Sequence, residues 1–65
     1  MIKVNFQWLA DTKGAVRFQE VGDDGRPKKS DADGAVIGSL YLRKAALKEL
    51  GISNLKGFTV TVTAI

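Results

Sequence analysis

Hydrophobic and polar residues alternate at the start of the chain in the pattern of a β-strand with one buried face. Residues 2–9 place apolar side chains at every second position: Ile2, Val4, Phe6 and Trp8. Residues 15–21, AVRFQEV, alternate again with Val16 and Phe18 on one face. The DTKG segment between them has the Asp and Gly residues typical of a turn. We therefore predict an antiparallel hairpin.

The C-terminal segment has the same period. Residues 58–64 place Phe58, Val60 and Val62 on one face and threonines on the other. The aromatic residues Phe6, Trp8, Phe18 and Phe58 all fall on the apolar side of their strands, so we expect these four to form the core.

The middle of the chain changes from a strand to a helix. Residues 35–42 carry apolar groups on both faces, which predicts a strand covered on two sides. Residues 43–50, RKAALKEL, are good helix formers and precede Gly51, a typical helix C-cap. A helix this short is stable only when packed, so we expect Leu47 and Leu50 to lie against the sheet. Residues 52–57 then return the chain to the last strand.

Residues 22–34, GDDGRPKKSDADG, have Ala32 as their only non-proline apolar side chain and are predicted to be a mobile, solvated loop. The fold class is therefore α+β: a single domain of residues 1–65 with a small, mostly antiparallel sheet or barrel. It comprises strands at about 2–9, 15–21, 35–42 and 58–64 and one short helix at about 43–50.

Composition narrows the class of protein. The chain has 65 residues, a net charge of +3 and no cysteine, so no disulfide stabilises its small core. This favours a reducing compartment, predicted as the cytoplasm, and a homodimer. No apolar stretch is long enough to span a bilayer, and the alternating N-terminus is unlike a signal peptide.

Catalysis is disfavoured because the chain has neither His nor Cys, which excludes the commonest general base, the thiolate nucleophile and the usual transition-metal ligands. The carboxylates of DDG and DADG are too few for a tight calcium site, and no phosphate-binding glycine loop is present. We therefore predict no enzyme activity, no cofactor, no metal and no small-molecule substrate.

A basic group at the junction of strand and helix is the candidate site. Tyr41 faces away from Leu40 and Leu42 and lies close in sequence to several cations. The candidate nucleic-acid-binding residues are Arg17, Tyr41, Arg43, Lys44 and Lys48. The cations would contact phosphates while the ring assists. The alternative is structural: Arg43, Lys44 and Lys48 form the solvated face of the helix, and Lys48 interacts with the helix dipole.

Residues 34–63, from GAVIGSLYLRKAALKELGI to FTVTV, weakly resemble half of the swapped-hairpin transcription-regulator and antitoxin-type fold. That resemblance implies dimerisation by interleaved hairpins and DNA binding by basic residues. The phrases AVRFQEV, IGSLYLRKAAL and TVTVT also resemble small uncharacterised proteins of actinobacteria and their phages, which implies an accessory or mobile-element protein.

Two functions follow as hypotheses. The first is an interaction module that acts through a protein partner or self-association, using the threonine strand or the long loop. The second is a weak nucleic-acid-binding protein, for DNA or RNA, that uses the basic group. The first is favoured.

Overall fold

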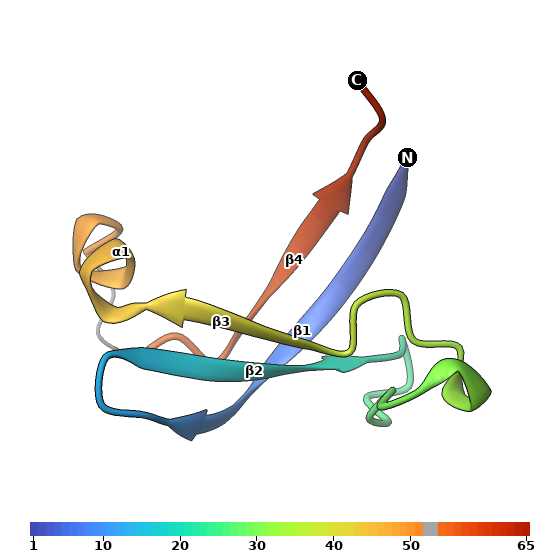
Figure 1. Ribbon diagram of the computed structural model, residues 1–65, viewed down its shortest axis with the longest axis horizontal. Coiled ribbons are helices and arrows are strands. Elements are labelled where there is room, and N and C mark those ends of the chain that lie inside the picture. Colours follow the sequence, from blue (N-terminus) through green and yellow to red (C-terminus); the bar gives the residue numbers. More distant parts are fainter. Residues whose placement is uncertain (52–53) are drawn as a thin grey trace.

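The computed structural model, described here for residues 1–51 and 54–65, is a curled half-barrel sheet with one short helix (Figure 1). The strands are β1 (Ile2–Asp11), β2 (Ala15–Val21), β3 (Ser39–Arg43) and β4 (Gly57–Val62), and the helix is α1 (Lys44–Glu49). All neighbouring strands are antiparallel, in the order β3-β2-β1-β4. The predicted small α+β fold is confirmed.

The β1–β2 hairpin forms as predicted, but β1 continues to Asp11. A bulge between Trp8 and Ala10 shifts the register, so Ala10 pairs with Arg17 and Asp11 with Val16. The turn is closed by Thr12, whose backbone N–H and side-chain hydroxyl both donate to the Ala15 carbonyl at 2.8 Å. The bulge adds a residue to one strand and so lengthens it beyond the predicted end.

Strand β3 begins at Ser39, four residues later than predicted. The N–H groups of Val36, Ile37 and Gly38 donate to the Glu20 side chain rather than to a neighbouring strand. Gly38 has a φ of 91°, a value that glycine adopts far more readily than other residues, so the backbone is not extended just before β3 begins. A side chain therefore replaces the strand ladder at this point.

The prediction that β3 is covered on two sides is wrong. β3 lies at an edge of the sheet, and Tyr41 is 58% exposed. Apolar groups occur on both of its faces because Leu40 and Leu42 contribute to the core, while Tyr41 lies on the solvent side.

Helix α1 differs from its predicted bounds by a residue at each end. Leu47 is buried in the core, but Leu50 is 64% exposed, so the expectation that both pack on the sheet is wrong for Leu50. Leu50 has already left the helix as its C-cap residue. Gly51 follows with a φ of 72°, as a glycine C-cap predicts. The predicted return segment includes residues 52 and 53, which lie outside the described residues.

Strand β4 approaches β1 closely at Gly57. A Cβ atom there would lie 2.6 Å from the Phe6 carbonyl oxygen, so only glycine fits this position. The strand ends at Val62, two residues before the predicted end. Its threonines lie on the solvent face as predicted, and the Thr59 hydroxyl donates to Asn5 Oδ1 at 3.0 Å.

The core lies on the concave side of the sheet, named the inner face, with α1 against it (Figure 1). Its buried members are Val4, Phe6, Val16, Phe18 and Leu47. Phe58 packs against two of them, stacked on Phe6 with ring centroids 5.4 Å apart and edge-on to Phe18 at 4.7 Å. Three of the four aromatic residues predicted for the core are therefore in it.

Trp8 is the exception. It lies on the predicted face, opposite Phe18, but is 51% exposed. Its indole N–H donates to Asp11 Oδ1 at 3.0 Å, which keeps the polar edge of the ring at the surface. Trp8 borders the core rather than filling it, because a hollow lies between its ring and Leu47 of α1.

The long connection between β2 and β3 is held by backbone hydrogen bonds. The Gly22 N–H donates to the Arg26 carbonyl at 2.9 Å, and the Lys28 N–H to the Glu20 carbonyl at 2.8 Å. Residues Asp31–Asp33 form a turn of 3₁₀-helix. The predicted mobility of residues 22–34 stays a prediction.

Candidate functional site

The convex side of the sheet, named the outer face, carries most of the polar side chains of the four strands. Its residues are Lys3, Asn5, Gln7, Arg17, Gln19, Ser39, Tyr41, Arg43, Thr59 and Thr61. The ionisable side chains in this set are bases apart from Tyr41, and no carboxylate is among them. The nearest acid in the hydrogen-bond network is Asp23 of the loop, which accepts a 3.4 Å bond from Asn5.

Arg17 and Tyr41 form the centre of this face. They are paired across β2 and β3, and the Arg17 guanidinium lies 5.9 Å from the centroid of the Tyr41 ring. This is a cation–π contact. Arg17 also donates from Nη2 to the Ser39 hydroxyl at 3.3 Å. Its Nε is buried and has no hydrogen-bond partner among the described residues.

An open hollow of about 410 Å³ lies beside Arg17. It is lined by Leu9, Arg17, Gln19, Pro27, Lys29 and Ser39. This volume lies within the roughly 300–1,000 Å³ range of ligand pockets. Its lining combines an apolar part from Leu9 and Pro27 with the charges of Arg17 and Lys29.

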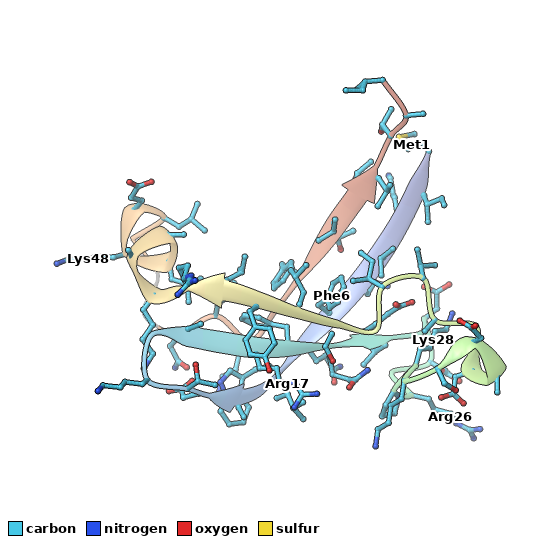
Figure 2. All side chains as sticks on the ribbon, viewed as in Figure 1. Met1, Phe6, Arg17, Arg26, Lys28 and Lys48 are labelled. Atoms are coloured by element: carbon cyan, nitrogen blue, oxygen red, sulfur yellow. The ribbon has the colours of Figure 1, made fainter. Side chains whose placement is uncertain are left out.

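The structure brings together three of the five predicted nucleic-acid-binding residues. Arg17, Tyr41 and Arg43 share the outer face. Lys44 begins α1, and its backbone N–H donates to the Gly14 carbonyl at 3.1 Å, so it lies at the adjoining end of the sheet. Lys48 lies apart from Arg17: it projects from α1, the helix that packs on the inner face (Figure 2).

Sequence reasoning missed other polar groups of the outer face. Lys3 shares its face with Asn5 and Gln7, and the alternation of β1 was sufficient to place it there. Lys29 lines the hollow from the loop, where no periodicity applies. No sequence pattern indicated that Lys29 would lie there.

Glu20 fixes the loop to the sheet. It is 2% exposed and lies at an inner-face position opposite Phe6. Its carboxylate accepts bonds from the backbone N–H groups of Val36 at 2.9 and 3.1 Å, Ile37 at 2.7 Å and Gly38 at 2.9 Å. A glutamate in phase with core positions was the sequence signal for this contact.

Burial raises the pKa of Glu20, but the hydrogen bonds from Ile37, Gly38 and Val36 and the charge of Lys28 lower it by more, so the pKa lies below that of an ordinary glutamate. Gln19, on the opposite face, supports the same loop. Its side-chain amide donates to the Lys28 and Gly38 carbonyls, both at 2.9 Å. These bonds position the loop residues that line the hollow.

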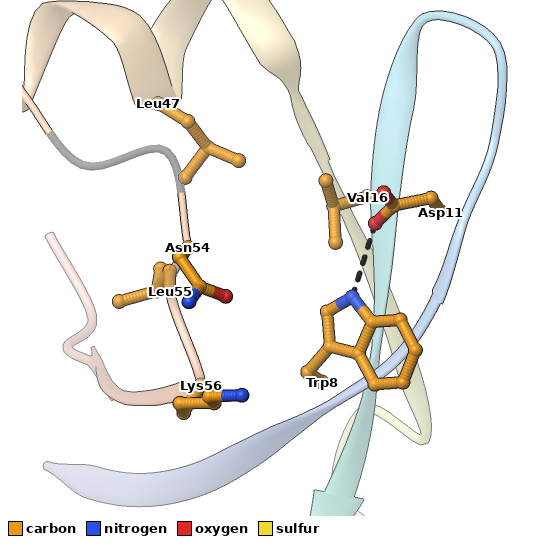
Figure 3. Close-up of a pocket in the computed structure, with 7 residues that line it drawn as sticks. All are labelled: Trp8, Asp11, Val16, Leu47, Asn54, Leu55 and Lys56. Carbon is orange, nitrogen blue, oxygen red and sulfur yellow. Dashed lines mark hydrogen bonds between the residues drawn. The ribbon is translucent and has the colours of Figure 1, made fainter.

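A second hollow, of about 190 Å³, lies on the inner face between β1, β2 and α1 (Figure 3). Its lining includes Trp8, Asp11, Val16, Leu47 and Leu55. Figure 3 shows the Trp8 ring along one side and Leu47 and Leu55 on the other, with the indole bonded to Asp11. Asp11, Asn54 and Lys56 make its lining about as polar as apolar, and it is below the size of typical ligand pockets.

Within the described part of the chain, no three His, Cys, Asp or Glu side chains gather in a group able to hold a metal ion. Among residues 1–51 and 54–65, no helix is long and apolar enough to cross a membrane. Comparisons of the chain with protein-family models, curated proteins and solved structures found no match.

Proposed function

We propose that the protein is a non-enzymatic interaction module that associates with a second copy of itself. The main support for self-association is the large solvent-accessible surface area of the chain. The chain of 7.0 kDa exposes 4955 Å², whereas a compact monomer of this mass exposes about 4,000 Å². The surplus, roughly 900 Å², is close to the 800 Å² or so that each partner buries in a standard interface.

The dimensions agree with this surplus. The radius of gyration is 12.2 Å, against about 10.7 Å for a compact domain of this length. The sheet curls through half a barrel and leaves its concave side open beyond the core (Figure 1). A second copy placed on that side would cover it.

Exposed apolar side chains lie along this open side. Ile2 and Val62 pair with each other on the inner face, where β1 and β4 reach the chain termini, and are 47% and 41% exposed. Trp8 is exposed at the other end of the same face of β1. Ile2 and Val62 thus form one exposed apolar patch, separated from Trp8 by the buried Val4 and Phe6. Exposed apolar patches can mark interaction sites in small proteins.

The edge strand β4 provides the second part of the proposed interface. It is paired only with β1 among the described strands, and its sequence, GFTVTV, has neither a charge nor a proline. Charged residues and prolines on an edge strand are what proteins use to block edge-to-edge pairing, and this strand lacks both. Two copies of β4 can therefore pair about a two-fold axis, each presenting the same surface to the other.

The test is the mass in solution with and without a charge in this interface. We expect wild-type protein to have a mass near twice 7.0 kDa by light scattering after size exclusion, and Val62→Lys to be monomeric because it buries an unpaired charge. Val36→Lys is the matched control, since Val36 is 52% exposed but lies in the loop. It should remain dimeric.

A wild-type protein that stays monomeric at millimolar concentration would overturn the proposal. So would a Val62→Lys variant that keeps its native circular dichroism spectrum and remains dimeric. Loss of association in both lysine variants would contradict the assigned location of the interface.

A further inference from the structure

The charges of the outer face have few protein partners. Among the described residues the one salt bridge joins Arg26 to Asp24 at 3.6 Å, within the loop. Lys3, Arg17 and Arg43 are therefore free of ion pairs there. Strands that carry three bases and no acid on one face create a positive potential that attracts polyanions.

The Arg17 guanidinium has hydrogen-bond donors that the described residues leave largely unsatisfied. Its Nε lies beneath the surface with no hydrogen-bond partner in the described chain, and a buried unpartnered donor costs free energy. Its neighbour Nη2 has a single long bond of 3.3 Å to Ser39. Because Nε is buried, an oxyanion at the outer face would meet the guanidinium at its Nη groups and supply an acceptor there in addition to Ser39.

Tyr41 adds an exposed ring to this basic surface. Arg17 lies against the ring from the neighbouring strand, and Arg43 lies two residues along β3 on the same face. Despite the contact with Arg17, Tyr41 remains 58% exposed. Exposed rings between cations on a sheet are how single strands of nucleic acid are held, by base stacking and phosphate contacts together.

We propose that the outer face binds single-stranded nucleic acid, with a base stacked on Tyr41 and phosphates at Arg17, Arg43 and Lys3. A duplex fits this surface less well, because its bases are stacked on each other and their faces are hidden from Tyr41. The hollow lined by Leu9, Pro27 and Lys29 lies next to Arg17 and accommodates the neighbouring nucleotide. The inner face remains free for the second copy.

The experiment measures the fluorescence anisotropy of a labelled oligothymidine of about 20 nucleotides at 50 and 200 mM NaCl. An oligouridine of equal length tests RNA in the same way. Three phosphate contacts predict a salt slope near −2 for a single strand, or about a 20-fold loss of affinity between these concentrations. Arg43→Gln removes one phosphate contact, so the magnitude of the slope should fall by about 0.7. The loss of affinity between the two salt concentrations should then be only about sevenfold.

Lys48→Gln is the matched control. It removes the same charge from an exposed position on α1, so its salt slope should equal that of wild type. If Lys48→Gln and Arg43→Gln weaken binding equally, the outer face is not the site and the proposal is overturned. Circular dichroism of each variant verifies that the fold is retained.

Tyr41 is tested by separating stacking from charge. Tyr41→Ser should weaken binding of oligothymidine by at least about fivefold, whereas Tyr41→Phe, which keeps the ring, should bind as wild type does. An abasic strand of equal length should bind wild type and Tyr41→Ser equally. The proposal is overturned if wild-type protein binds the abasic strand as tightly as oligothymidine. It is also overturned if wild-type protein binds neither oligothymidine nor oligouridine at 50 mM NaCl.

Discussion

Replacing Glu20 by glutamine should weaken the contact that fixes the loop to the sheet. The Glu20 carboxylate accepts bonds from three consecutive backbone N–H groups, with N···O distances from 2.7 to 3.1 Å. A glutamine has one acceptor oxygen, and its NH₂ group faces donors. Because all three N–H groups donate to Oε1, a glutamine oxygen at that position keeps these bonds, but they become bonds to a neutral acceptor. The NH₂ group then replaces Oε2, so the Val36 N–H loses its second bond, of 3.1 Å, and faces a donor.

The magnitude follows from these bonds. A hydrogen bond to a charged group contributes about 1.5–3 kcal/mol, and one to a neutral group about 0.5–1.5 kcal/mol. Since three bonds are each weakened by about 1 kcal/mol, the free energy of unfolding should fall by about 2–4 kcal/mol. That is a large part of the total stability expected for a domain this small, at the low end of about 5–15 kcal/mol.

The effect should depend on pH. Because the pKa of Glu20 is depressed in the folded protein, its contribution to stability is present above the pKa of the unfolded chain and is lost as pH falls through the folded pKa. Wild type and Glu20→Gln should therefore differ most at neutral pH. Their difference should shrink in acid, where the carboxyl group is also uncharged.

Urea denaturation followed by circular dichroism at pH 7 and pH 3 measures both effects. Asp33→Asn is the matched control: it makes the same acid-to-amide change at an exposed carboxylate that accepts one bond, from the Lys29 N–H at 3.0 Å. It should cost less than about 1 kcal/mol. Equal destabilisation by Glu20→Gln and Asp33→Asn at pH 7 would refute the role given to Glu20.

Two further predictions concern packing and backbone approach. Phe18→Ala should cost about 3–5 kcal/mol because Phe18 is fully buried, whereas Trp8→Ala should cost about half as much, since half of Trp8 is exposed; thermal melts of the two variants give the order. Gly57→Ala should lower the melting temperature because its Cβ would meet the Phe6 carbonyl at 2.6 Å, while Gly14→Ala, with nothing within 4 Å, should be neutral or slightly stabilising. The reverse order in either pair contradicts the corresponding assignment.

The sequence by itself determined the elements that depend on local periodicity. The alternation in β1 and β2, with a turn between them, was sufficient to predict the hairpin. The Ala/Leu segment before Gly51 was sufficient to predict the helix. Alternation also assigned Phe6, Phe18 and Phe58 to one face, because a strand directs every second side chain to the same side.

Tertiary structure decided the features in which a distant residue competes with the local pattern. The strand pattern from residue 35 is interrupted because Glu20, 16 residues before Val36, takes the N–H groups that a ladder would use. Burial was decided in the same way. Trp8 and Leu50 have core-like spacing, yet Trp8 lies beside an open hollow and Leu50 lies beyond the last residue of the helix, so both are exposed. The outer face likewise depends on strand order, which alone places Arg17 beside Tyr41 and leaves Lys48 elsewhere. Periodicity assigns a side chain to a face, but what covers that face depends on contacts between segments far apart in the chain.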